Sequence, residues 1–143
     1  MKYGIWAAGL AFAALCGPAF GQVSMAQVKA RYSATYNACL AAPSGQSTMG
    51  QGFCITAETT LQDAALNAAY QKSMGQLAAP QQATLVTAER AWIAFRDADC
   101  AAQGNQGLGT LQGTLQAQCV LNRTIIRTIE LDDFPVNLAG PAG

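Results

Sequence analysis

The sequence predicts an all-α fold, a single-domain four-helix up-down bundle stapled by disulfides. Alanine, glutamine and leucine dominate the chain after residue 21, a composition typical of helices. Beyond that point prolines occur only at positions 43, 80, 135 and 141, which leaves long stretches free of helix breakers. Alternating β-branched residues, the pattern of a half-buried strand, are scarce, whereas apolar residues recur at helical spacing.

The first helix is expected to run from Ser24 to about Ala42. The Ser24 hydroxyl can cap its start, and Pro43 stops it. One face of this helix would carry Val28, Tyr32, Thr35 and Cys39. The segment 43–52 is predicted to be a loop.

The second and third helices are expected to form an antiparallel hairpin. The second runs from about Phe53 to Leu77, with an apolar stripe of Leu66, Tyr70 and Leu77. Pro80 breaks the chain, and the third helix follows from Gln81 to about Ala102. Its inward face is predicted to hold Leu85, Trp92 and Arg96, with Ala88 and Phe95 beside them and Arg90 and Asp97 on another face.

A glycine-rich turn over 104–109 leads into the fourth helix, from about Leu111 to Asp133. We expect this helix to bury Leu115, Cys119, Ile126 and Ile129 or their close neighbours. The sequence therefore predicts one helical domain over 22–134 and a flexible tail over 135–143.

Residues 1–21 have the pattern of a secretory signal peptide. Lys2 supplies the positive end, residues 5–16 form a short apolar core, and Ala19 and Gly21 are the small residues of a cleavage site. The apolar run is shorter than the roughly 20 residues of a membrane span, so we expect no stable membrane insertion after cleavage. Lipidation at Cys16 is the alternative, but Leu15 before it is not small. A periplasmic or secreted protein is predicted.

Cleavage would leave an even set of cysteines in an oxidising compartment: Cys39, Cys54, Cys100 and Cys119. Four cysteines allow three pairings, and the spacing alone does not choose among them. A zinc site is disfavoured because the chain has no histidine and no Cys-x-x-Cys pair. We expect no metal and no cofactor.

The charge of the mature chain excludes some partners. Seven basic residues face eight acidic ones, a net charge of −1, so neither nucleic acid nor an anionic membrane is expected to bind. A protein partner would have to be recognised by shape and local contacts rather than by long-range steering.

An enzyme is the least favoured class. Histidine, the usual base beside a serine or cysteine nucleophile, is absent. Asp97 and Asp99 point apart on a helix, although Asp63 or Glu58 opposite Asp97 could form a carboxylate pair. We favour these acids as solvated surface groups and as partners of Arg90 and Arg96. The glycine-rich turn lacks the Lys-Ser/Thr of a phosphate loop.

Several short motifs follow one another along the chain. They are YNACL at 36–40, Cys54, LNAAY at 66–70 after Asp63, AERAWIAFRDADC at 88–100, and C-x-x-x-x-T-x-x-R from Cys119 to Arg127. In this combination the chain resembles the lysozyme inhibitor LprI family of small exported helical domains. Glu89 stands where the family more often has glutamine.

The resemblance implies disulfides that pair Cys39 with Cys54 and Cys100 with Cys119. The residues that match the motifs can be architectural or can bind a partner: Asp63, Asn67, Tyr70, Trp92, Arg96, Asp97 and Arg127. We expect Trp92 and Tyr70 to be core residues first, and Arg96 to be an internal residue with a polar partner.

The resemblance also implies a protein-binding function, with a lysozyme-type muramidase in the cell envelope as the leading partner. Two alternatives stay open. One is an envelope structural protein or a binder of glycan or another small ligand without inhibitory activity, and the other is immunity against a wall-degrading toxin.

Overall fold

The computed structural model describes residues 22–138, and every regular element in that range is helical, as predicted. The expected signal peptide and the last five residues of the expected tail lie outside it. In chain order the elements are α1 (Met25–Ala30), α2 (Ala34–Ala41), the 3-10 turn η1 (Pro43–Gln46), α3 (Thr48–Gln76), α4 (Ala79–Gly104) and α5 (Leu111–Leu138).

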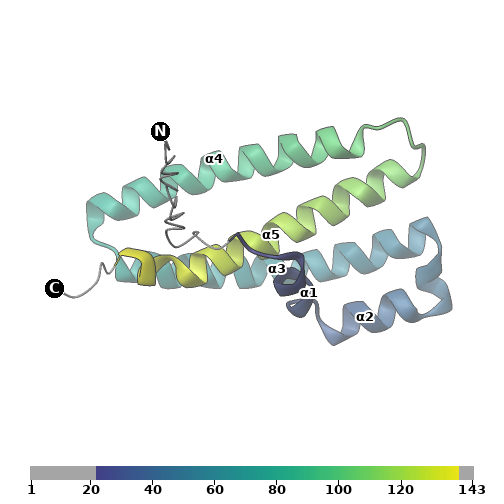
Figure 1. Cartoon of the computed structure of the whole chain (residues 1–143), viewed down its shortest axis with the longest axis horizontal. Coiled ribbons are helices and arrows are strands. Elements are labelled where there is room, and N and C mark those ends of the chain that lie inside the picture. The colour runs from purple at the N-terminus through teal and green to yellow at the C-terminus, as the bar shows by residue number, and fades with distance from the viewer. Residues whose placement is uncertain (1–21, 139–143) are drawn as a thin grey trace, which may run out of the picture.

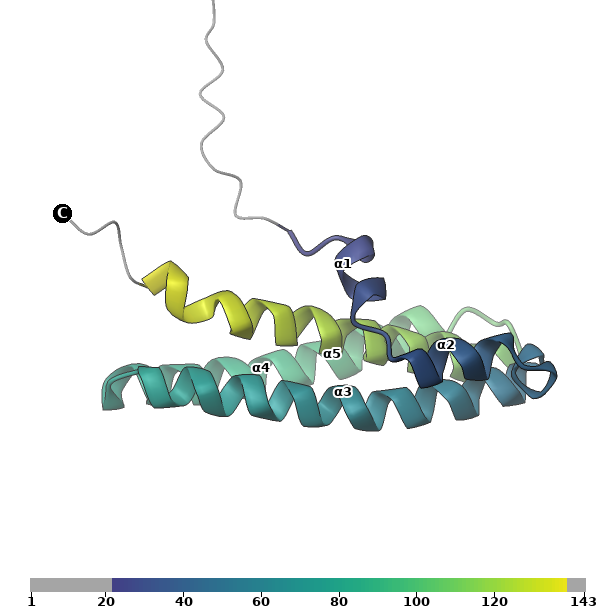
Figure 2. The same ribbon diagram turned by 90° about the horizontal axis from the view of Figure 1, so that it is seen from below.

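Three long helices run up and down, and a short helical pair takes the place of the fourth (Figure 1). The most extensive contact is between α3 and α5, while α4 packs on α5 and has few contacts with α3. Helix α2 lies along one end of α3, and α1 crosses α5 (Figure 2). Helix α5 is therefore the element that joins the others.

The prediction of one continuous first helix is wrong, because the chain breaks between α1 and α2. Ser33 has an extended backbone, and its hydroxyl caps α2 by accepting from the amide of Tyr36 at 3.0 Å. The buried carboxylate of Glu58 accepts from the Ser33 amide at 2.9 Å and from its hydroxyl at 2.6 Å. Gln62 donates to the carbonyl of Arg31 at 2.9 Å, so the polar groups of the break find partners inside the protein.

This break corrects two further expectations. It changes the helical register, so Tyr36 is buried and Thr35 is exposed, whereas the continuous helix placed Thr35 inward. Glu58, expected to be a solvated surface acid, is only 1% exposed. Its burial is tolerated because Ser33 and Gln62 donate three hydrogen bonds to it.

Several helix boundaries also differ from the prediction. Helix α3 begins at Thr48 rather than near Phe53, because Ser47 caps it by accepting from the amide of Gly50 at 3.0 Å. The predicted loop over 43–52 is thus a 3-10 turn followed by the first turn of α3. At the other end of the chain α5 continues to Leu138, past the predicted end at Asp133 and into the expected tail.

The hydrophobic core forms two clusters along α5. The larger lies where α1, α2 and α3 meet α5 and contains Val28, Tyr36, Cys54, Ile55, Leu121, Ile125 and Ile129. The smaller lies near the α3–α4 turn, with Ala69, Leu85 and Leu131 buried and Leu66, Tyr70 and Leu77 packed against them. Leu115, predicted to be buried, is 37% exposed because it lies before the segment of α5 that these clusters enclose.

Two disulfides join neighbouring helices, in the pairing that the resemblance implies. Cys39 of α2 bonds to Cys54 of α3, and Cys100 of α4 bonds to Cys119 of α5. They close chain segments with sequence separations of 15 and 19 residues. The chain-entropy model gives about 3 kcal/mol of stabilisation for each loop of that size.

Among the described helices, none is both long and apolar enough to cross a membrane.

Gly50→Ala should destabilise the protein strongly, and Gly52→Ala is its matched control. A Cβ atom at Gly50 would overlap the carbonyl oxygen of Ser44, whereas a Cβ atom at Gly52 meets nothing within 4 Å. We expect Gly50→Ala to lower the free energy of unfolding by at least about 2 kcal/mol. Gly52→Ala should raise it by about 0.5–1 kcal/mol, since alanine favours the helix. Denaturant melts of both variants check this, and similar values would contradict the close approach of η1 to α3.

Candidate functional site

Both disulfides lie at the same end of the bundle, where α2 turns into α3 and α4 turns into α5. We call this region, residues 39–54 and 100–119, the stapled end. Figure 1 shows its two connections on the same side of the molecule. The Thr114 hydroxyl donates to the carbonyl of Thr48 at 3.3 Å, a direct link between α5 and the start of α3. The two connections therefore form one surface.

Tight glycine packing fixes the turn between α2 and α3. Gly45 is buried against the backbone of Cys39 and Leu40, where a side chain has no room. The turn between α4 and α5 is different: Gly107 and Gly109 have φ values of 72° and 59°, and a Cβ atom at either would meet nothing within 4 Å. Glycine is needed there for backbone conformation rather than for space.

The stapled end exposes large apolar side chains. Met49 is 74% exposed and Phe53 71%, both on the first two turns of α3. Three leucines of the opposite connection are also exposed: Leu108, Leu111 and Leu115. Single exposed apolar residues are common, but several together on one end of a small domain are typical of a contact surface.

The stapled end is also free of charge. Residues 32–57 and 100–122 contain no Asp, Glu, Lys or Arg. Asp99 and Arg123 border the second of these segments and pair with each other at 2.8 Å. Polar groups at this end are therefore amides, hydroxyls and backbone groups, which hydrogen-bond without net charge.

An open groove of about 650 Å³ lies between the start of α3 and the start of α5. Met49 and Phe53 line one side, and Thr110 and Thr114 line the other. A second hollow of about 360 Å³ continues from it between the same two helices, past Thr56. The groove combines apolar side chains with hydroxyl groups.

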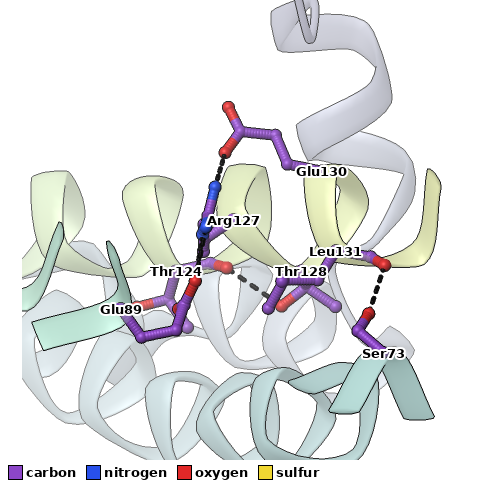
Figure 3. A network of polar contacts seen from close by, with 7 residues as sticks. All are labelled: Ser73, Glu89, Thr124, Arg127, Thr128, Glu130 and Leu131. Carbon is purple, nitrogen blue, oxygen red and sulfur yellow. Dashed lines mark hydrogen bonds and ion pairs between the residues drawn. The ribbon is translucent and has the colours of Figure 1, made fainter. Parts of the chain in front are cut away.

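The predicted site residues of α4 and α5 lie elsewhere, in a polar seam between these helices. Arg127 of α5 pairs with Glu89 of α4 and, at 2.8 Å, with Glu130 of its own helix (Figure 3). One helical turn before Arg127 on α5, Arg123 pairs with Asp99 of α4. Burial lowers the pKa of Arg127, but the hydrogen bonds and charges of Glu89 and Glu130 outweigh it, so the pKa lies above its usual value.

Trp92 and Arg96 belong to the same seam, and Trp92 is not the fully buried core residue that the stripe predicted. Trp92 is half-buried, whereas Leu85, Cys100 and Gly104 are the fully enclosed residues of α4. The Arg96 guanidinium lies 5.1 Å from the centre of the Trp92 ring, a cation–π contact.

Arg96 has polar partners, as expected, and the acid among them, Asp97, is one of those expected for it. It pairs with Asp97, its neighbour on the same helix, at 2.8 Å. It also makes a long hydrogen bond of 3.4 Å to the buried hydroxyl of Thr124. Arg96 and Arg127 thus contact α5 or α4 rather than open solvent, which favours an architectural role for both.

The motif residues of α3 separate into two groups. Tyr70 packs against the smaller core cluster. Asp63 is half-buried and Asn67 exposed, and neither has a hydrogen-bond or ion-pair partner among the described side chains. The seven motif residues therefore do not converge on one site, and sequence reasoning missed Met49 and Phe53. The signal that could have found them is the pair of long uncharged segments around the cysteines.

A group of possible metal ligands is formed by Asp99, Cys100 and Cys119, whose ligand atoms lie within 4.8 Å of one another. Both sulfurs are bonded to each other in the disulfide, so neither is a thiolate. In the oxidised protein this group therefore lacks the ligands that a zinc site needs.

Two tyrosines form a polar cluster beside the larger core. The Tyr32 hydroxyl donates to Asn122 at 2.6 Å, and the Tyr36 hydroxyl donates to Gln118 at 2.8 Å. Burial raises the pKa of both phenols; a hydrogen bond with Gln118 offsets this in part, and the charge of Glu58 adds to it. Both phenols therefore ionise at a higher pH than a free tyrosine does.

The seam predicts different effects for its two kinds of ion pair. Glu89→Ala leaves Arg127, whose side chain is 17% exposed, without its partner on α4. We expect the free energy of unfolding to fall by about 1–3 kcal/mol. Glu130→Ala removes an acid that is 45% exposed and leaves Arg127 paired with Glu89, so it should change the free energy of unfolding by less than about 0.5 kcal/mol. Urea melts compare the two, and equal losses would show that the Glu89 pair does not hold α4 to α5.

The tyrosine cluster predicts a loss of stability at alkaline pH. Because the folded-state pKa of Tyr32 and Tyr36 is raised, their contribution is complete below about pH 10, the unfolded pKa, and is lost as the pH rises through the folded values. Unfolding measured between pH 8 and pH 12 should show this decline. The double variant Tyr32→Phe, Tyr36→Phe should show a shallower one, and an unchanged slope would refute the assignment.

The fold and its cross-links define a class of protein, the small all-helical domain stapled by disulfides between neighbouring helices. Comparison with protein families is more specific: the model of the family described as Lysozyme inhibitor LprI matches residues 25–131. The chain belongs to this family, as its motifs indicated. No curated protein and no solved structure matches the chain.

Proposed function

We propose that the mature protein is an exported, non-enzymatic inhibitor that binds a lysozyme-type muramidase in the cell envelope. The family match over 25–131, which spans most of the described residues, carries this proposal. The uncharged, apolar stapled end supports it, since a surface of this composition gains free energy when a partner protein covers it.

Location outside the cytoplasm is part of the proposal. Two disulfides pair all four cysteines of the described chain, as is usual for proteins of oxidising compartments. Residues 1–21 would direct export and be removed, leaving one domain over 22–134.

A binding role is favoured over catalysis by the placement of the acids. The carboxylate pair considered from the sequence needs Glu58 or Asp63 to face Asp97 across a substrate. Glu58 is buried, with its oxygens occupied by Ser33 and Gln62, so it cannot reach a substrate. Asp97 is occupied by Arg96.

One alternative has an observation of its own. The groove between α3 and α5, about 650 Å³ in volume and lined by hydroxyls beside Phe53, has the composition of a site for a neutral glycan. In that case the protein would bind envelope glycan without inhibiting an enzyme. Immunity against a wall-degrading toxin is a variant of the inhibitor function with a different partner.

The oxidised mature protein should slow the lysis of a peptidoglycan suspension by a muramidase. Turbidity is followed with a panel of animal, phage and bacterial enzymes, and direct binding is measured by calorimetry. Reduction should abolish inhibition, because the two connections of the stapled end lose their cross-links. Absence of both inhibition and binding at micromolar protein across the panel would refute the inhibitor function.

A further inference from the structure

We propose that the stapled end is the inhibitory surface and that it covers the sugar-binding cleft of the muramidase. This inference rests on the proposed function and adds to it the contacting surface of each partner. Three properties of the stapled end carry it: its lack of charge, its exposed apolar side chains and its two disulfide cross-links.

The lack of charge matches the chemistry of the cleft. A glycosidase cleft contains a pair of carboxyl groups and otherwise binds neutral sugar rings. An acidic inhibitor surface would be repelled by those carboxylates, but residues 32–57 and 100–122 contain no acid. Asp99 at the border is neutralised by Arg123. The amide side chains of the stapled end can donate hydrogen bonds to a carboxylate and accept hydrogen bonds from donors in the cleft. The N-acetyl and hydroxyl groups of an N-acetylated sugar do the same.

Phe53 and Met49 are the anchors. Phe53 is 71% exposed, and Met49, 74% exposed, stands one helical turn before it. A sugar cleft accommodates pyranose rings, whose C–H faces are apolar and whose edges carry hydroxyl groups, and a phenyl ring beside threonine hydroxyls offers a similar combination of apolar and polar groups. Buried aromatic anchors usually supply most of the energy of an interface.

The cross-links restrict the conformations that the surface can adopt before it binds. Each of its two connections is closed by its own disulfide, and the hydrogen bond from the Thr114 hydroxyl to the Thr48 carbonyl joins the two connections. A surface that is ordered before binding loses little conformational entropy when it enters a cleft. The same disulfides that stabilise the fold therefore also prepare the binding surface.

The decisive variant is the double change Met49→Ser, Phe53→Ser. Its matched control is Leu61→Ser, Ile93→Ser, which removes two exposed apolar side chains from the middle of α3 and α4. We expect at least tenfold weaker binding and inhibition for the first variant, and a change of less than about twofold for the control. Circular dichroism and thermal melts establish that both are folded.

Raising the salt from 50 to 500 mM should change the Kd of the wild-type protein for the muramidase by less than about threefold, because salt screens an uncharged interface only weakly.

Occupancy of the cleft is tested with a trimer of N-acetylglucosamine. The trimer should compete with the inhibitor for the muramidase, and simultaneous binding of both would overturn this inference. Binding of the trimer to the isolated inhibitor would overturn it too, and would assign the groove to glycan. If wild type inhibits and the Met49, Phe53 variant inhibits equally, only the assignment of the surface fails. If wild type binds no muramidase, the proposed function fails with it.

Discussion

The two-sided character of α5 is the constraint on which the rest of the structure depends. One side of this helix is apolar and packs Leu121, Ile125 and Ile129 into the larger core with α1, α2 and α3. The side toward α4 is polar and holds Arg123 and Arg127 in ion pairs. One helix thus joins a conventional hydrophobic core to a charged seam, and the short α1–α2 pair completes the bundle where α4 does not reach.

The molecule separates its two kinds of surface along its length. Charged groups lie in the seam, on α1 and in the later turns of α3 and α5, whereas the stapled end is uncharged and apolar. An exposed apolar end would ordinarily lower stability or favour aggregation. Here the two disulfides at this end stabilise the folded chain. Covalent cross-links allow the side chains at this end to face outward rather than fill a core.

The sequence was sufficient for the fold class, the long helices and, through the family resemblance, the disulfide pairing. It was insufficient where a distant residue decides local structure. The break at Ser33 depends on Glu58 and Gln62, which lie far along the chain and give no local signal. Likewise, the apolar spacing along α4 correctly placed Trp92 on the face that meets α5. At that contact, however, α5 contributes Thr124 and arginines rather than an apolar surface. The spacing of apolar residues predicts which face of a helix is turned inward, but the residues that contact this face are known only from the packing of the helices.

Helix α4 is fastened to the rest of the domain by covalent chain at both ends. Its first residues follow directly from α3, and Cys100 near its last turn is bonded to Cys119 of α5. If the seam between α4 and α5 opens to water, α4 cannot dissociate from the domain, because its two ends remain covalently attached to α3 and α5. Its return is then an intramolecular event at high effective concentration. A polar interface that would be too weak to hold a free helix is adequate for one that is tethered at both ends.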